Sequence, residues 1–187
     1  MKNIVFMGTP EYAAKILRAL AEAKFEIAAV FTQPDKPVGR KQILTSSEVK
    51  VYAQQHLPAV PIFQPATLKD EAVAAQIKEL KPDFIVVAAY GKILPQAILD
   101  IAPCINLHAS ILPKYRGASP IQSAILAGEK QTGVTAMLMD AGLDTGDMLD
   151  FAYTPCEDKT AAQLFDELGD LAGELIVRVL QNFANLT

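Results

Sequence analysis

The stretch "DFIVVAA" (83–89) is a short run in which every residue after Asp83 is apolar. A run of this length and composition is typical of a β-strand that is buried on both of its faces. Strands of this kind belong to parallel sheets that helices cover on each side. The stretch therefore predicts an α/β fold rather than an antiparallel sheet with one solvated face.

The rest of the chain supports this by alternating apolar runs with amphipathic segments. Further strands are expected at residues 3–7, 26–31, 60–64, 104–108, 133–139 and 148–154. Helices are expected over 68–80 and 95–101. Two more should begin at a residue followed by proline: one after Thr9-Pro10, and one from Ser119-Pro120 to Leu126. Two should begin at capping boxes: one from Thr45–Glu48 to His56, and the last helix after Thr160 and Gln163. The alternation predicts a mainly parallel central sheet with helices on both faces.

Length and composition limit the possible classes of protein. The chain has 187 residues, of which 51% are hydrophobic, and a net charge of −4. These values suit one domain with a substantial core, and the negative charge means that any nucleic-acid contact must be local. The two cysteines, Cys104 and Cys156, match no metal or redox spacing and are expected in the core. With no signal peptide and no apolar run near the length of a membrane span, a cytoplasmic location is expected.

The predicted domain covers residues 1–182. Residues 183–187 show no pattern of a helix or strand. They are expected to be a terminal tail or the start of a linker to a C-terminal domain that this chain does not contain.

A polar pair lies at the end of one predicted strand, in "CINLH" (104–108). Residues two apart in a strand share one face, roughly 6–7 Å apart, so Asn106 and His108 should project together. Burying such a pair without partners is costly, whereas opening it into a cleft is not. Ligands of parallel sheets bind beyond the carboxyl ends of the strands, which is where this pair should lie.

Asp144 lies in the glycine-containing loop "DAGLDTGDM" between two predicted strands. A carboxylate beside His108 would orient the imidazole and favour its charged form. The imidazole would then move a proton, and the Asn106 amide would stabilise an oxyanion. This set suits attack on a carbonyl by an external nucleophile.

Other interpretations remain open at this point. His108 is also consistent with a structural histidine, and Asp140, Asp144 and Asp147 with turn formation. A metal site built from one imidazole and these loosely spaced carboxylates is disfavoured, so no metal is expected. His56 is expected to be a solvated surface residue.

A longer set of motifs resembles the formyltransferase family that uses 10-formyltetrahydrofolate. The similar segments are "IVFMGTPEYAA", "QPDKPVGR", "AAYGKILP", "INLHASILPKYRGASPIQSAILAG" and "TGVTAMLMDAGLDTGDML", which together span nearly the whole chain. The resemblance implies a Rossmann-like formyltransferase domain. It is closest to the branch that formylates the methionine of initiator Met-tRNA for translation initiation.

The resemblance also implies roles for particular residues. Asn106, His108 and Asp144 match the family's catalytic set, and Ser110, Ile111, Leu112 and Pro113 match a segment that contacts the folate. Residues 86–95 and 139–146 resemble the walls of the pterin pocket. The family's reaction uses 10-formyltetrahydrofolate as co-substrate, without a metal or a covalent enzyme intermediate.

The identity of the acceptor depends on other segments. After the first strand, "GTPEYA" has one glycine and an acid, unlike the phosphate loop of the glycinamide ribonucleotide enzymes. Residues 35–50 carry four basic and two acidic side chains and resemble a loop that touches tRNA, with Arg40 and Lys41 as expected phosphate contacts. The alternative is a related enzyme whose acceptor is water or a sugar amine. The tRNA-specific family members continue into a second domain, so full tRNA affinity is expected to need that part.

Overall fold

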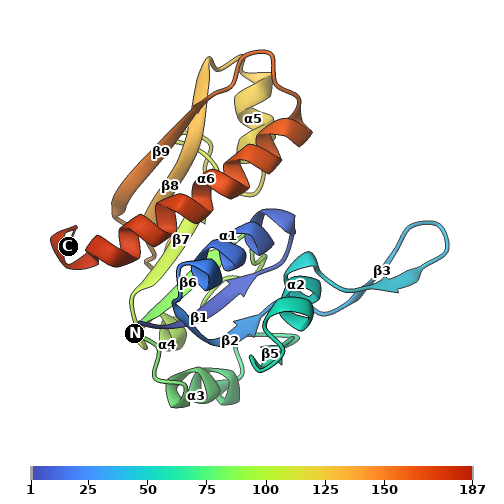
Figure 1. The fold of residues 1–187 in the computed structure, drawn as a ribbon, viewed down its shortest axis with the longest axis vertical. Coiled ribbons are helices and arrows are strands. Elements are labelled where there is room, and N and C mark those ends of the chain that lie inside the picture. The colour runs from blue at the N-terminus through green and yellow to red at the C-terminus, as the bar shows by residue number, and fades with distance from the viewer. Residues whose placement is uncertain (1, 187) are drawn as a thin grey trace.

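The computed structural model describes residues 2–186 of the protein and shows one seven-stranded sheet with helices against both faces (Figure 1). In spatial order the strands are β5 (Ile62–Phe63), β2 (Glu26–Phe31), β1 (Asn3–Gly8), β6 (Phe84–Ala88), β7 (Cys104–His108), β8 (Gln131–Leu138) and β9 (Met148–Pro155). The first five are parallel, whereas β8 and β9 add antiparallel pairs. The expected mainly parallel sheet is confirmed.

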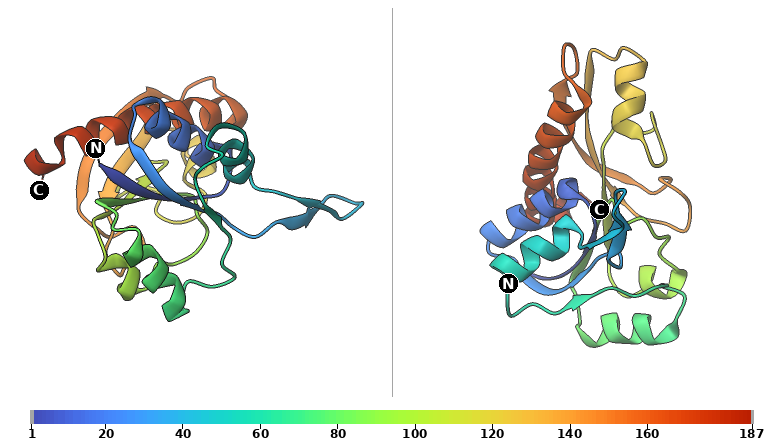
Figure 2. Two further views of the ribbon diagram at one scale, coloured as in Figure 1. Left: turned by 60° about the horizontal axis from the view of Figure 1, so that its bottom comes forward. Right: turned by 90° about the vertical axis from the view of Figure 1, so that its right-hand side faces the viewer.

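The helices are α1 (Glu11–Glu22), α2 (Glu48–His56), α3 (Glu71–Glu79), α4 (Gln96–Leu99), α5 (Pro120–Leu126) and α6 (Ala161–Asn182). They cover opposite faces of the sheet, as the two views in Figure 2 show. Alternate residues of β1 enter different cores: Ile4 and Phe6 pack with α1 and α6, while Val5 and Met7 pack on the side of α3 and α4. Burial on both faces explains why such strands are apolar at every position.

Two helix starts differ from the sequence-based expectation. The N-cap of α1 is Pro10 rather than Thr9, and the Thr9 hydroxyl donates to the Tyr90 carbonyl at 3.1 Å. Ser47, not Thr45, caps α2 by accepting from the backbone N–H of Lys50. Thr45 is unavailable because it ends a strand. The capping box of Thr160 and Gln163 is present as expected.

A β-hairpin takes the place of the expected loop before α2. Its strands, β3 (Lys36–Val38) and β4 (Ile43–Thr45), pair antiparallel and project away from the body of the domain (Figure 1). All six residues are exposed, including Val38, Ile43 and Leu44. Three-residue strands without a buried face carry no hydrophobic periodicity, so the pattern did not reveal them.

The C-terminal segment is more ordered than its sequence suggests. Phe183–Asn185 forms a 3-10 turn that continues from α6, and the Phe183 ring packs edge-on against Phe84 with centroids 4.9 Å apart. Met1 and Thr187, the outer ends of the predicted domain and tail, lie outside the described residues. The boundary at residue 182 stays a prediction.

Candidate active site

The main candidate site is a cavity of about 440 Å³ at the carboxyl ends of the central strands. The loops that follow β1, β6 and β7 contribute to it, and so does the loop between β8 and β9. This is where ligands bind in open α/β sheets, because the strand ends leave a crevice between diverging loops.

Asn106 and His108 both line this cavity from β7. Their neighbours Ile105 and Leu107 point to the opposite face and belong to the core beneath α1 and α6. Asn106 is half-buried and His108 is buried. The alternation along β7 therefore produces the predicted polar pair on one face.

The two nitrogens of the His108 ring have different neighbours. Nε2 lies 2.8 Å from the carbonyl oxygen of Tyr115. A carbonyl only accepts hydrogen bonds, so Nε2 carries the proton. In the neutral ring Nδ1 then keeps its lone pair, and it lies 3.7 Å from Oδ1 of Asp144. This distance is an ion-pair contact when the ring is charged and is too long for a hydrogen bond.

The Asp144 carboxylate is itself positioned. Its Oδ2 accepts from the backbone N–H of Gly117 at 2.8 Å, and the side chain is only 9% exposed. Asp144 has φ of +52°, a conformation that non-glycine residues rarely adopt. Such conformations persist when the surroundings determine them and occur often at functional sites.

The loop that carries Asp144, between β8 and β9, also needs its glycines. A Cβ at Gly146 would collide with the carbonyl oxygen of Leu138, so this position accepts no side chain. Asp140 accepts from the Thr145 hydroxyl at 2.7 Å and the Gly142 N–H at 2.8 Å, and these bonds lower the pKa of its carboxyl. Asp140 therefore acts as a turn former, one of the roles considered for the aspartates of this loop.

Most residues of the two segments predicted to form the walls of a pterin pocket, 86–95 and 139–146, line this cavity, and Ile93 and Leu143 form an exposed apolar rim. Contact of these walls with a pterin stays a prediction. Sequence analysis missed Tyr12, which lies on α1 and donates from its hydroxyl to the Leu107 carbonyl at 3.1 Å. Burial raises the pKa of Tyr12. Its helical spacing looks like that of any core residue, so no local signal distinguished it.

The segment predicted to contact folate lies beside the cavity rather than in its lining. Ser110, Ile111, Leu112 and Pro113 are not among the lining residues. The fully buried Ser110 donates to the Lys114 carbonyl at 2.6 Å, and the Leu112 N–H donates to the Thr135 hydroxyl at 3.0 Å. These bonds hold the turn that follows β7. Direct folate contact by these four residues stays a prediction.

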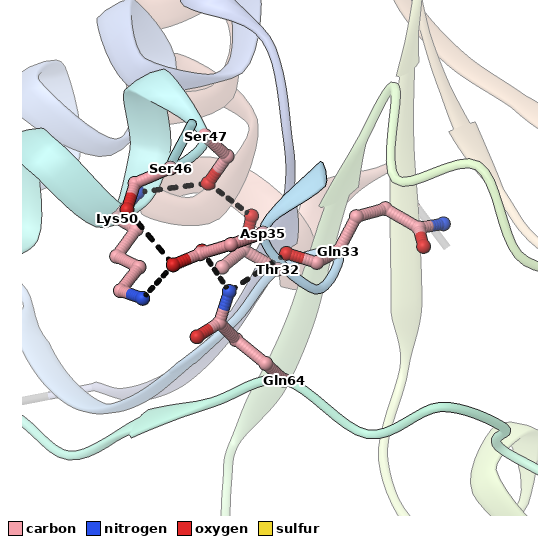
Figure 3. Close-up of polar contacts among 7 residues, drawn as sticks. All are labelled: Thr32, Gln33, Asp35, Ser46, Ser47, Lys50 and Gln64. Atoms are coloured by element: carbon pink, nitrogen blue, oxygen red, sulfur yellow. Dashed lines mark hydrogen bonds and ion pairs between the residues drawn. The ribbon is translucent and has the colours of Figure 1, made fainter. Parts of the chain in front are cut away.

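Arg40 and Lys41 lie at the exposed turn of the β3–β4 hairpin, well away from the cavity lining. A polar cluster holds the base of this hairpin, as Figure 3 shows. Asp35 accepts from Lys50 and Gln64, each at 2.7 Å, and from Ser46 at 3.1 Å. The Lys50 contact, followed by that of Gln64, lowers the pKa of the Asp35 carboxyl. The hairpin thus presents Arg40 and Lys41 at its turn, in addition to Lys36 on β3, from an anchored base.

Among residues 2–186, no group of three or more histidine, cysteine, aspartate or glutamate side chains could hold a metal ion. None of the helices in this part of the chain is long and apolar enough to cross a membrane. Cys104 and Cys156 are both buried and unpaired, and burial raises the pKa of the Cys104 thiol to about 12.

Comparison with known proteins decides the family. Residues 1–180 match the family described as "Formyl transferase". The chain belongs to this family. Its formyl transferase fold is also seen in a phosphoribosylglycinamide formyltransferase from Bacillus halodurans, which superposes with a TM-score of 0.79 over 97% of this chain and 95% of that one. At 22% sequence identity this likeness concerns the fold alone.

Two curated members of the formyl transferase family are much closer in sequence. A methionyl-tRNA formyltransferase of Campylobacter curvus is 72% identical over 185 residues, which are 99% of this chain and 62% of that protein. One of Campylobacter jejuni subsp. doylei is 59% identical over 188 residues, again 62% of its length. The chain therefore spans about three fifths of the length of these curated relatives.

Proposed function

We propose that the protein transfers a formyl group from 10-formyltetrahydrofolate to the α-amine of methionine on initiator tRNA, in the cytoplasm where translation begins. The observation that carries this proposal is the convergence of Asn106, His108 and Asp144 on one cavity in a member of the formyl transferase family. High identity to proteins called methionyl-tRNA formyltransferase supports the choice of acceptor.

The cavity suits a folate co-substrate. Its volume of about 440 Å³ falls within the usual range for small-molecule sites. Polar side chains such as Asn106 and His108 line it together with apolar ones such as Leu94 and Met139. Bound there, the folate supplies the formyl group on N10. The apolar surroundings would exclude water and so favour the amine over hydrolysis.

The three polar residues then divide the reaction. The Asn106 amide donates to the formyl oxygen as negative charge develops on it during attack by the amine. His108 takes the proton of the attacking amine at Nδ1, the nitrogen left free by the Tyr115 carbonyl. Asp144 faces the imidazolium that forms. The new C–N bond replaces the bond to N10, and the proton passes from His108 to the departing N10.

The hairpin suggests how the acceptor is held. Arg40 and Lys41 stand on an anchored projection, and phosphate contacts of this kind position a nucleic acid without reading its sequence. With a net charge of −4 over the whole chain, the domain itself offers little general attraction for tRNA. We therefore propose that the additional part present in the longer relatives is needed for full tRNA affinity.

A direct assay tests the proposed function. The protein is mixed with 10-formyltetrahydrofolate and initiator Met-tRNA, and formylmethionine is measured after hydrolysis of the ester. Parallel reactions offer a nucleotide-linked amino sugar, or water alone, as the acceptor. Formylation of Met-tRNA alone supports the proposal, whereas release of formate or formylation of the sugar would identify the alternative enzyme.

Asp144→Asn is expected to slow transfer by about 10²-fold or more while the fold stays intact, because the neutral amide no longer stabilises the imidazolium. The amide oxygen can still accept from the Gly117 N–H, so the loop keeps its anchor. The measurement is turnover at saturating substrates, with thermal unfolding as the check on structure. Unchanged turnover would remove Asp144 from the catalytic set.

Arg40→Ala is expected to weaken tRNA binding, and to do so about equally for tRNAs of different sequence. The slope of the logarithm of the binding constant against the logarithm of the salt concentration should become shallower by about one unit. Folate binding should not change, because Arg40 lies outside the cavity. The measurement is filter binding at several salt concentrations. Lys69→Ala, which removes an exposed cation outside the hairpin, is the matched control. An unchanged salt slope for Arg40→Ala would exclude a phosphate contact.

A further inference from the structure

The turn that receives the His108 hydrogen bond is itself strained. Tyr115, whose carbonyl accepts from Nε2 of His108, has φ of +57°. A bulky residue rarely adopts this left-handed conformation, and it persists only when neighbouring contacts hold it. Something other than local backbone preference must therefore keep this carbonyl pointed at the imidazole.

Glu129 supplies such contacts from outside the cavity. It lies between α5 and β8, and its Oε1 accepts from the Tyr115 hydroxyl at 2.7 Å and from the Lys114 ammonium at 2.8 Å. Two consecutive residues of the turn are thus tied to one oxygen. The contacts are electrostatically consistent: Lys114, then Tyr115, lower the pKa of Glu129, while Glu129 raises the pKa of Lys114 and of Tyr115.

The same turn is tied down on its inner side. The Ser110 hydroxyl donates to the Lys114 carbonyl at 2.6 Å, and the Gly117 N–H binds the Asp144 carboxylate. The backbone between residues 114 and 117 therefore contacts both His108 and Asp144. Glu129 is the anchor that holds the side chains of this turn from the far side.

We propose that Glu129 is a positioning residue for His108, which acts through Tyr115 to fix the tautomer and orientation of the imidazole. This inference rests on the proposed function, and it adds to the site a residue that supports His108 without lining the cavity. The Tyr115 carbonyl fixes the proton on Nε2, so the lone pair of Nδ1 faces Asp144, which lines the cavity together with His108. When Glu129 is absent, the strained turn can relax and its carbonyl can leave the imidazole. Part of the protein then carries the proton on Nδ1 and cannot accept one there.

The ordinary alternative is an exposed ion pair with no effect on the site. The structure offers a matched control for it. Glu167 on α6 likewise accepts from one hydroxyl, that of Thr154, and from one ammonium, that of Lys159 at 2.6 Å. None of these three residues lines the cavity. Loss of Glu167 should therefore reproduce any general effect of losing a surface carboxylate, but not an effect on His108.

The test reads the tautomer directly. Long-range ¹H–¹⁵N NMR of the 187-residue protein is recorded at a pH of about 8.5, where ordinary imidazoles are neutral. The exposed His56 serves as an internal reference. The wild type and Glu167→Ala should show His108 with its proton on Nε2. Glu129→Ala and Tyr115→Phe should both shift His108 toward a mixture of tautomers.

Glu129→Gln should keep most of the wild-type pattern, because its amide oxygen still accepts from the Tyr115 hydroxyl. In the transfer assay, Glu129→Ala should lower turnover about tenfold at an unchanged folate Kd, as expected for a misplaced catalytic group. Glu129→Gln should restore most of this loss.

Wild-type His108 signals in both Glu129→Ala and Tyr115→Phe would overturn the proposal, as would an equal shift in Glu167→Ala. If Glu129→Ala does not fold, Tyr115→Phe decides the question, because it removes only the hydroxyl that reaches Glu129. The NMR result does not depend on catalysis. A wild-type protein that transfers no formyl group even at saturating Met-tRNA would therefore refute the proposed function separately from the tautomer result.

Discussion

Replacing His108 with alanine is expected to lower turnover by about 10²–10⁴-fold, the usual contribution of a positioned general acid–base group. The Kd for tetrahydrofolate should change little, since the proposed proton transfer is made in the transition state and not in the bound ground state. Removal of the buried ring also leaves the Tyr115 carbonyl without its donor, so thermal unfolding must be followed beside turnover.

The other histidine provides the matched control for this experiment. His56 is exposed near the end of α2 and stacks on Tyr52, with ring centroids 4.7 Å apart. His56→Ala should leave both turnover and folate binding at wild-type values. The assigned role of His108 is wrong if its alanine variant turns over normally and only its folate Kd rises.

Asn106→Ala is expected to lower turnover by about 10²–10³-fold, because one donor to the developing oxyanion is lost. The Asn106 side chain is half-buried and lines the cavity on the same side as His108. Because it is not part of the hydrophobic core, the substitution should disturb the sheet little. Single-turnover measurement with bound folate separates the chemical step from folate binding.

Asn182→Ala is a suitable control because that side chain is exposed near the end of α6, where it donates to the Arg178 carbonyl at 2.9 Å, and it does not line the cavity. It should behave as wild type. If Asn106→Ala raises the substrate KM and leaves the chemical step unchanged, its amide contributes to ground-state binding instead of oxyanion stabilisation.

Much of the fold could be predicted because the strands carry strong local signals. β2 and β7 were predicted at their observed bounds, because each contains a short run of mainly apolar residues that the sheet buries. The hairpin of β3 and β4 was missed, since nothing in it is buried. Its position depends on Asp35 and its contacts with Ser46, Lys50 and Gln64, which lie up to 29 residues away in the chain.

The candidate site also contains parts that the sequence predicted and parts that it did not. The two-residue period of a strand placed Asn106 and His108 together. Asp144 was considered as a partner of His108 from its glycine-containing loop, with turn formation as the alternative, and the resemblance to a known family favoured the catalytic role. The segment from Ser110 to Pro113 was expected to contact folate, but its observed contacts support the turn after β7. No sequence pattern indicated that Glu129 reaches this turn, because the contact joins segments 14 and 15 residues apart.

The sequence by itself determined the class of the fold and the face of β7 that carries the polar pair, because hydrophobic periodicity acts within a few residues. Only the tertiary structure decided the chemistry available to that pair. It brings the carbonyl of Tyr115 and the carboxylate of Asp144 to the two nitrogens of one imidazole. A change of a few tenths of an ångström in the donor–acceptor distance decides whether a hydrogen bond forms. Packing between segments that are remote in the chain sets that distance.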